Sequence, residues 1–570
     1  MRERGGLLRP GAVLGACLAL ALPGLPSAPA RPPAIGPTRI VPAEFRAPGT
    51  IPRLVFVSRA PAPGGFGVPG LGPAQRAIVT GGRLRVRERD GRIRDLLPEP
   101  ALFDVSDPAV SFDARRIAFS GTPHPDSAWR IYLVDADGRG LRAVTRTDRV
   151  LPGAGADAAR RARYDDLDPC WIGAERLCFA STRYPMSAQY AELPATNLFV
   201  VSTRLEDAGA APQRITAERN GAEEPALDPR SGEIVYSRWW FNRFRPTRPG
   251  EPEAAERDSV NLWHAIALTS DGPRLRCGSV KSRRAMMAYQ ITFLPDGTPV
   301  AACALNLGLW PRPGPLAIQR FGPAGAAVER IAGAVLPDSL MGGYSEALGL
   351  AAPAACAPAA LPDGRVVFSH DPGGRGDFGL WVVRPGRPGV ELVNLPGTLE
   401  LDAAPLAPRP HPRALVHFTP LSEPAPRNVT DLGSGSTFDY QSAGMFRAGP
   451  RAPGAPAWAR GTRIRFFAAP PPVESRSDTA VLIRELEVGE DGQVDARGLP
   501  ADMPLFEQLV GADGFALRAA HGPAHVAGFN AGTPGGRSRC VGCHLGHSAL
   551  PLPASATFPG RKPMRGGGTR

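Results

Sequence analysis

A short strand unit recurs along the chain from about residue 45 to residue 420, and this repeat restricts the folds open to it. Each copy has a short strand, a tight Asp/Gly turn, an apolar strand, a variable loop and a strand that ends in aromatic and aliphatic residues. The copies begin or centre at Arg53, Asp107-Pro108, Asp168-Pro169, Glu224-Pro225, Leu294–Gly297 and Leu361–Phe368. The equivalent turns, at positions 113, 174, 230, 296 and 363, are about 56 to 67 residues apart.

A single sheet of this kind cannot cover both of its faces, so stacking the copies around an axis is the natural arrangement. The repeat therefore predicts a mainly β fold, with a TolB-like β-propeller of six or seven blades over residues 31–425. An array of β-sandwiches with coincidentally similar turns is the alternative. The Asp-Gly pairs need no catalytic role, because hairpin turns require such residues.

Beyond the repeat, residues 426–530 read as a small β domain. Strands are expected at Arg463–Phe467, Val481–Leu486 and Leu505–Val510. Residues 531–550 form a further segment, and the basic, Gly-rich residues 551–570 are expected to be disordered.

The N-terminal 30 residues have the pattern of a secretory signal peptide. Arginines precede an apolar stretch at Val13–Leu22, and Ala28-Pro29-Ala30 is an A-x-A cleavage site. We therefore expect a periplasmic or extracellular protein without a membrane span after cleavage. Cys17 lies in a lipoprotein-like box, but the apolar segment continues beyond it, so anchoring through lipid is the less favoured alternative.

A formal charge of +12 is typical of nucleic-acid-binding proteins, but the identity and the distribution of the basic residues do not support that function. Of 66 basic residues, only Lys281 and Lys562 are lysines. No dense run of arginines alternates with aromatic residues, as a groove for single strands requires. We therefore expect no nucleic-acid partner; a face for an acidic redox protein stays open.

The segment 531–550 contains Cys540-Val541-Gly542-Cys543-His544, a C-x-x-C-H motif. Cysteines at this spacing can form thioethers to the two vinyl groups of one haem, and the adjacent histidine can bind the iron. The predicted export of the chain agrees with a haem site, because c-type haem is attached outside the cytoplasm. The sequence thus predicts one covalent haem c held by Cys540, Cys543 and His544, with His544 as the proximal iron ligand.

Two other readings of the motif are a structural zinc site and a redox-active C-x-x-C pair. No further cysteine pair stands at ligand spacing for zinc. The βαβ context of a thioredoxin-like pair is also missing.

The sixth ligand of the haem iron stays open at this point. His547 is three residues after His544 and would project from the same side of the haem. His521, His525 and Met503 are the candidates for the opposite face, and an open position is the alternative. The choice matters because two protein ligands favour electron transfer, whereas an open position favours chemistry.

Five cysteines remain outside the signal peptide and the motif. Cys170 and Cys178 are on predicted strands that flank the turn at Gly173-Ala174, so a disulfide between them is expected in an oxidising compartment.

The arrangement of propeller, small β domain and C-V-G-C-H resembles the hydrazine synthase alpha-subunit family. The residues that carry the resemblance are Asp166–Trp171, Phe179–Arg183, Leu499–Asp502, Pro504–Phe506 and Cys540–His544. The resemblance implies the same architecture and haem attachment. In the family, a tyrosine four residues after the motif histidine ligates the haem and the histidine binds zinc; here that position is Ser548. We do not expect the family's further domain with a second haem.

Three functions follow as alternatives. The first is an electron-transfer or redox subunit with a redox protein or other subunits as partner. The second is a haem-dependent oxidoreductase acting on a small nitrogen or oxygen species. The third is a propeller for binding or assembly with a structural or sensory haem. No Ser/His/Asp set, phosphate loop or catalytic carboxylate pair supports hydrolysis or phosphoryl transfer.

Overall fold

The structure is a computed structural model, and it describes the larger part of the chain. The described residues are 50–65, 67–98, 101–146, 164–184, 186–189, 193–242, 244–246, 262–269, 272–277, 287–304, 316–322, 327–336, 352–412, 419–421, 437–442, 459–469, 480–490, 492–517, 532–540, 550–552 and 564–565. The predicted signal peptide, residues 1–30, is outside them.

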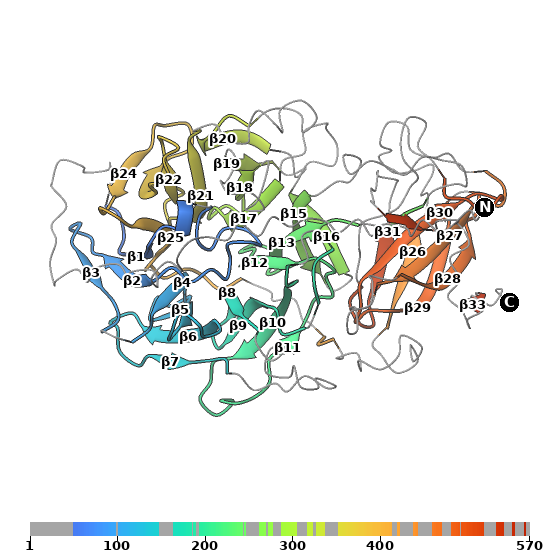
Figure 1. The fold of residues 1–570 in the computed structure, drawn as a ribbon, viewed down its shortest axis with the longest axis horizontal. Coiled ribbons are helices and arrows are strands. Elements are labelled where there is room, and N and C mark those ends of the chain that lie inside the picture. The colour runs from blue at the N-terminus through green and yellow to red at the C-terminus, as the bar shows by residue number, and fades with distance from the viewer. Residues whose placement is uncertain are drawn as a thin grey trace, which may run out of the picture.

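The repeat folds into six four-stranded antiparallel sheets in the part of the chain just given (Figure 1). From the innermost strand outward, three of them are β25 (Leu399–Pro405), β1 (Leu54–Arg59), β2 (Gly82–Arg87) and β3 (Ile93–Asp95); β4 (Asp104–Val110), β5 (Arg116–Thr122), β6 (Arg130–Asp135) and β7 (Arg142–Ala143); and β8 (Asp166–Gly173), β9 (Arg176–Ser181), β10 (Asn197–Ser202) and β11 (Gln213–Arg214). The others are β12 (Ala222–Leu227), β13 (Ile234–Trp240), β15 (Leu262–Thr269) and β16 (Gly272–Cys277); β17 (Met287–Phe293), β18 (Pro299–Ala304), β19 (Leu316–Phe321) and β20 (Ala327–Gly333); and β21 (Ala354–Ala360), β22 (Val366–Asp371), β23 (Gly379–Val383) and β24 (Val390–Val393).

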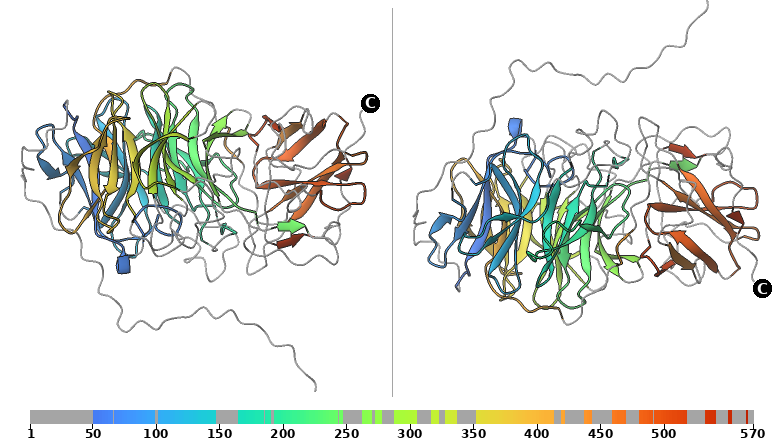
Figure 2. Two further views of the ribbon diagram at one scale, coloured as in Figure 1. Left: turned by 90° about the horizontal axis from the view of Figure 1, so that it is seen from above. Right: turned by 90° about the horizontal axis from the view of Figure 1, so that it is seen from below.

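The sheets are blades around one axis, so the predicted mainly β propeller is confirmed. The innermost strands contact one another in the order β4, β8, β12, β17, β21 and β25, and β25 returns to β4. The ring is closed by the last propeller strand, because β25 pairs antiparallel with β1 from the start of the repeat. Figure 2 shows the blades edge-on beside the C-terminal strands.

The Asp/Gly turns occur where the repeat predicts them. Gly297 and Gly364 both have a φ of 81°, which glycine adopts without steric cost. The Gly297 N–H donates to the Leu294 carbonyl at 2.8 Å, and the Gly364 N–H donates to the Leu361 carbonyl at 3.0 Å. These hairpins join the two inner strands of their blades.

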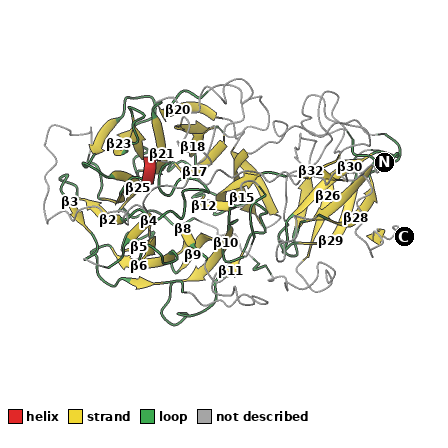
Figure 3. Ribbon diagram, in the orientation of Figure 1, coloured by secondary structure: helices red, strands yellow, loops and turns green. Residues whose placement is uncertain are grey.

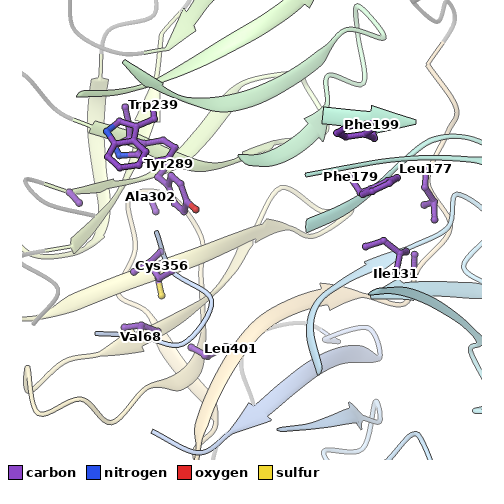
Figure 4. Close-up of a cluster of buried hydrophobic side chains, with 14 of the residues drawn as sticks. Val68, Ile131, Leu177, Phe179, Phe199, Trp239, Tyr289, Ala302, Cys356 and Leu401 are labelled. Atoms are coloured by element: carbon purple, nitrogen blue, oxygen red, sulfur yellow. The ribbon is translucent and has the colours of Figure 1, made fainter. Parts of the chain in front are cut away.

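Aromatic side chains bridge neighbouring blades in the largest buried cluster (Figure 4). The rings of Trp239 and Trp263 stack with centroids 5.4 Å apart, and Tyr289 of the next blade meets Trp263 edge-on at 5.0 Å. All three side chains are buried. Burying large rings between sheets, rather than within one, makes each blade depend on its neighbours.

The expected disulfide between Cys170 and Cys178 is not formed. The two residues are directly opposite each other in the β8–β9 pairing, as the sequence predicts, yet both thiols are free. Burial raises the pKa of Cys170 to about 11 and raises that of Cys178 well above its ordinary value. Both thiols are therefore neutral, and the Cys178 thiol packs within an apolar cluster.

The C-terminal strands form two sheets with a core of their own. One contains β26 (Thr437–Ser442), β29 (Val494–Pro500) and β31 (Arg537–Cys540), and the other contains β27 (Arg463–Ala468), β28 (Val481–Glu487) and β30 (Leu505–Val510). Tyr440 and Phe466 join the two sheets edge-to-face at 4.9 Å. The strands predicted from the sequence are β27, β28 and β30; β26, β29 and β31 were not anticipated.

Polar contacts attach these sheets to the propeller. The Arg214 guanidinium donates to the Asp502 carbonyl at 2.8 Å, and the Leu421 N–H donates to the Arg214 carbonyl at 2.9 Å. Thr533 Oγ1 donates to the Thr269 carbonyl at 3.2 Å. The C-terminal sheets thus contact the two blades that contain β11 and β15.

Two short strands are described at the boundary between residues 531–550 and 551–570 and within residues 551–570. β32 (Leu550–Leu552) pairs in parallel with β14 (Phe244–Pro246), and β33 (Met564–Arg565) pairs in parallel with β28. Backbone groups make these pairs, so a Gly-rich composition does not prevent them. The rest of the tail is outside the described residues.

Strands dominate the described chain, and η1 (Pro63–Gly65) is a single 3₁₀ turn (Figure 3). No helix in the described ranges has the length and apolar character to cross a membrane.

Replacing Asp166 with alanine should lower the free energy of unfolding by about 3–5 kcal/mol. The buried Asp166 carboxylate accepts hydrogen bonds from Arg183 Nε at 2.9 Å, Arg183 Nη2 at 2.7 Å and Ser181 Oγ at 2.7 Å. Its removal leaves a buried guanidinium without its counter-charge. Urea unfolding followed by circular dichroism measures the change.

The control is Glu206→Ala, which breaks an exposed pair with Arg204. A change below about 0.5 kcal/mol is expected there. Equal destabilisation by the two variants would contradict the role assigned to the buried pair.

Candidate functional site

The innermost strand of every blade has a β-bulge at the same height. In each bulge one residue adopts a left-handed conformation, with φ between 48° and 53°. These residues, called the axial ring below, are Asp107, Asp168, Glu224, Gln290, Ala357 and Asp402. Such φ values are strained for residues other than glycine, so the surrounding structure must hold them in place.

Side chains of the axial ring bond to the backbone of the following blade. Asp168 Oδ2 accepts from the Glu224 N–H at 3.0 Å, and Gln290 Oε1 accepts from the Ala357 N–H at 2.8 Å. The Asp402 carboxylate likewise accepts from the Asp107 N–H. A backbone group that the bulge removes from its own ladder is thus satisfied by the neighbouring blade.

The axial ring is acidic, and four of its members are carboxylic acids. Burial raises the pKa of Asp107, Asp168 and Glu224, and neighbouring carboxylates add to the effect at Asp107 and Glu224. Burial also raises the pKa of Asp402, to about 6. The ring lines a hollow of ≈ 160 Å³ together with prolines and alanines of the same strands.

Two buried arginines near the ring are bound to other acids. Arg59 Nη2 is 2.9 Å from Asp104 Oδ2, and Arg76 Nη1 is 2.5 Å from Glu223 Oε1. Both pairs are almost fully buried. Both arginines also act on the ring: Arg76 opposes the rise in the pKa of Asp168, and Arg59 opposes the rise in the pKa of Asp107 and Asp402.

Sequence reasoning did not single out the axial ring, although one signal for it was present. Three successive copies of the repeat place an acid directly before proline, at Asp107-Pro108, Asp168-Pro169 and Glu224-Pro225. The repeat alone does not show that these acids occupy bulges that face one axis.

The predicted haem residues are mostly outside the described part of the chain. Cys540 is the last residue of β31, whereas Cys543, His544, His521 and His525 are outside the described residues. Their mutual geometry is therefore not described. The Met503 side chain is 8% exposed and packs in the core of the C-terminal sheets.

The structure does describe what flanks the motif. Cys540 pairs with Ser442 at the end of the parallel β26–β31 ladder, where β31 is the edge strand of its sheet. Residues 541–549 then lead to β32, whose partner β14 is in the connection between β13 and β15 of a propeller blade. Strand pairing thus holds the described residues on both sides of the motif, at Cys540 to a C-terminal sheet and at Leu550–Leu552 to β14 of the β13–β15 connection.

No protein-family model matches the sequence, and no curated protein matches it. Among solved structures, Kuenenia stuttgartiensis hydrazine synthase is similar with a TM-score of 0.59 and 15% identity, over 87% of this chain and 69% of that chain. TolB from Acinetobacter baumannii covers 62% of this chain and 67% of its own, with 16% identity and a TM-score of 0.37.

The first likeness includes more of the chain than the propeller strands alone, so it extends to the C-terminal sheets. At 15% identity it concerns the fold. The expected resemblance to the hydrazine synthase architecture is thus supported at the level of the fold.

In a buffer without divalent cations, the free energy of unfolding should fall as the pH rises from about 4 to about 6. The pKa of Asp402 is about 6 in the folded protein and about 3.9 in an unfolded chain. The folded state therefore binds more protons in this window, and stability present below it is lost as the carboxyl ionises.

Thermal melts at successive pH values measure the slope, and Asp402→Asn should reduce it. Part of the pH dependence of stability should remain in that variant, because burial raises the pKa of Glu400 to about 7. Asp137→Asn, at an exposed turn, should leave the profile unchanged. A profile of Asp402→Asn identical to that of the parent would contradict this assignment.

Proposed function

We propose that this chain is an exported c-type cytochrome with one covalent haem, acting as an electron-transfer or redox subunit whose propeller is the docking platform. The sequence Cys540-Val541-Gly542-Cys543-His544 carries the proposal. Two thiols and an imidazole at this spacing fit the two vinyl groups and the iron of a single haem. When bound, haem c supplies a one-electron couple at its iron.

The strands that flank the motif support a haem at the C-terminal sheets. Cys540 is anchored by its pairing in β31, and β32 anchors the other end of the segment to β14. Thr533, just before β31, bonds to the Thr269 carbonyl of a blade.

The iron ligands decide which role is open to the protein. His544 is proposed as the proximal ligand, and either His521 or His525 as the distal one. Met503 is the less favoured candidate, because its side chain packs among apolar residues of the C-terminal core. Two protein ligands would suit electron transfer with a redox protein or other subunits.

Export is part of the same proposal. Residues 1–30 are proposed to be removed after Ala30, which would place the mature protein in the periplasm or outside the cell. That compartment is the one in which the thioether bonds of haem c are made.

A second candidate is a haem enzyme acting on a small nitrogen or oxygen species. The fold likeness to hydrazine synthase favours it. Against it, Ser548 stands where the family has its tyrosine ligand. This candidate requires an open position at the iron.

Purified protein from a host that attaches haem c should contain one covalent haem per chain. The pyridine haemochrome spectrum and the intact mass report it, and the mass also reports cleavage after Ala30. Cys540→Ala with Cys543→Ala should remove the covalent haem, because both thioethers are lost. Cys170→Ala, in the propeller, should retain it; covalent haem in the double variant would sink the proposal.

Visible and EPR spectra with and without cyanide or nitric oxide separate the two candidate functions. Electron transfer predicts a low-spin iron that does not respond to either molecule. His521→Ala or His525→Ala, whichever removes the distal ligand, should then convert the iron to high spin. A parent protein that is high-spin and binds both molecules would instead favour the enzyme.

A further inference from the structure

Three carboxylates converge at the propeller axis. Asp107, Asp168 and Glu224 come from the innermost strands of three successive blades, and one oxygen of each is within 4.8 Å of the others. The matching bulges in β4, β8 and β12 bring them together. All three line the hollow described above.

One oxygen of this group lacks a hydrogen-bond partner. Asp168 is 3% exposed, and its Oδ1 is buried without a partner, while its Oδ2 takes the Glu224 N–H. A buried carboxylate oxygen without a partner destabilises the folded state, because it has lost its hydrogen bonds to water. Either a proton shared with the neighbouring Asp107 carboxyl or a cation would remove this cost.

The nearby arginines offset the charge of this group only in part. Arg59 and Arg76 form short buried pairs with Asp104 and Glu223, which lie outside the group of three. Because each arginine is shared with a further acid, three ionised carboxylates would lack a full counter-charge, and like charges at this separation repel.

We propose that Asp107, Asp168 and Glu224 bind a calcium ion on the propeller axis. The donors are all oxygen, which selects a hard cation over zinc or copper. Calcium binds oxygens at about 2.3–2.6 Å, so two of its ligands are at most about 5 Å apart. The measured spacing fits that shell, and the ≈ 160 Å³ hollow leaves space for the water molecules that complete it.

The ion would link three blades at a point where side-chain bonds already join neighbours. Without it, the blades meet through mutually repelling carboxylates; with it, the same carboxylates share one counter-charge. An ion that binds the folded ring but not the unfolded chain raises the free energy of unfolding with the logarithm of its free concentration above the Kd.

Isothermal titration of the purified full-length protein, stripped with EGTA and titrated with CaCl₂ at pH 7.5, tests the proposal. One site per chain is expected, and CaCl₂ should raise the melting temperature. Asp168→Asn should weaken calcium binding at least 100-fold and abolish the thermal shift. Asp137→Asn, which removes an exposed carboxylate elsewhere, should bind like the parent.

The stability of Asp168→Asn in EGTA distinguishes a lost ligand from a damaged fold. The variant should melt no lower than the stripped parent, because it removes a repelling charge. If it melts much lower, Glu224→Gln replaces it as the test variant with the same expected loss of binding.

Three results would overturn the proposal: no binding of CaCl₂ by the stripped parent, unchanged affinity in both ring variants, or tighter binding of MgCl₂ or MnCl₂ than of CaCl₂. If low pH stabilised the protein and no ion bound, the three carboxylates would instead share a proton.

Discussion

Each propeller sheet has to be covered on both faces, and the rest of the structure follows from that requirement. All six residues are buried in each of β1, β2 and β18. β1 and β18 are largely apolar on both faces, and in β2 the alternating Arg83, Arg85 and Arg87 are buried as well, so all three strands are covered from both sides. Sheets of this kind are stable only with a neighbour on each side, and a closed ring provides one for every sheet.

Closing the ring brings six inner strands to one axis, where backbone space is short. Each inner strand has a bulge at this crowded point, and one residue of each bulge adopts a left-handed conformation. Asp168 and Gln290 then bond to the blade that follows. The bulges that satisfy these backbone groups also bring the carboxylates of neighbouring blades close together at the axis. The acidic site is therefore a consequence of closing the ring.

The sequence predicted the parts of the fold that depend on local residues. Turns at Asp296-Gly297 and Asp363-Gly364 follow from the φ that glycine permits, and the strand at Arg463–Phe467 follows from its apolar pattern. The pairing of β25 with β1 was not predicted, because its partners are far apart in the sequence and have no local signal. The axial ring was missed for the same reason: Asp168 becomes part of a site only through residues on other blades. The Cys540–His544 motif is the opposite case, since its chemistry can be read from five consecutive residues.

The late position of β25 has a consequence for how the chain must fold. Blade β1–β3 is complete only after residue 405 has been made, and until then the inner edge of β1 has no strand to pair with. That edge belongs to the buried segment Leu54–Arg59, and unpaired apolar edges are sites of aggregation. A chain that emerges from its N-terminus onward would carry this unpaired edge until residue 405 of 570 has emerged. Its yield should therefore depend on helper proteins that shield the first blade until the last propeller strand arrives.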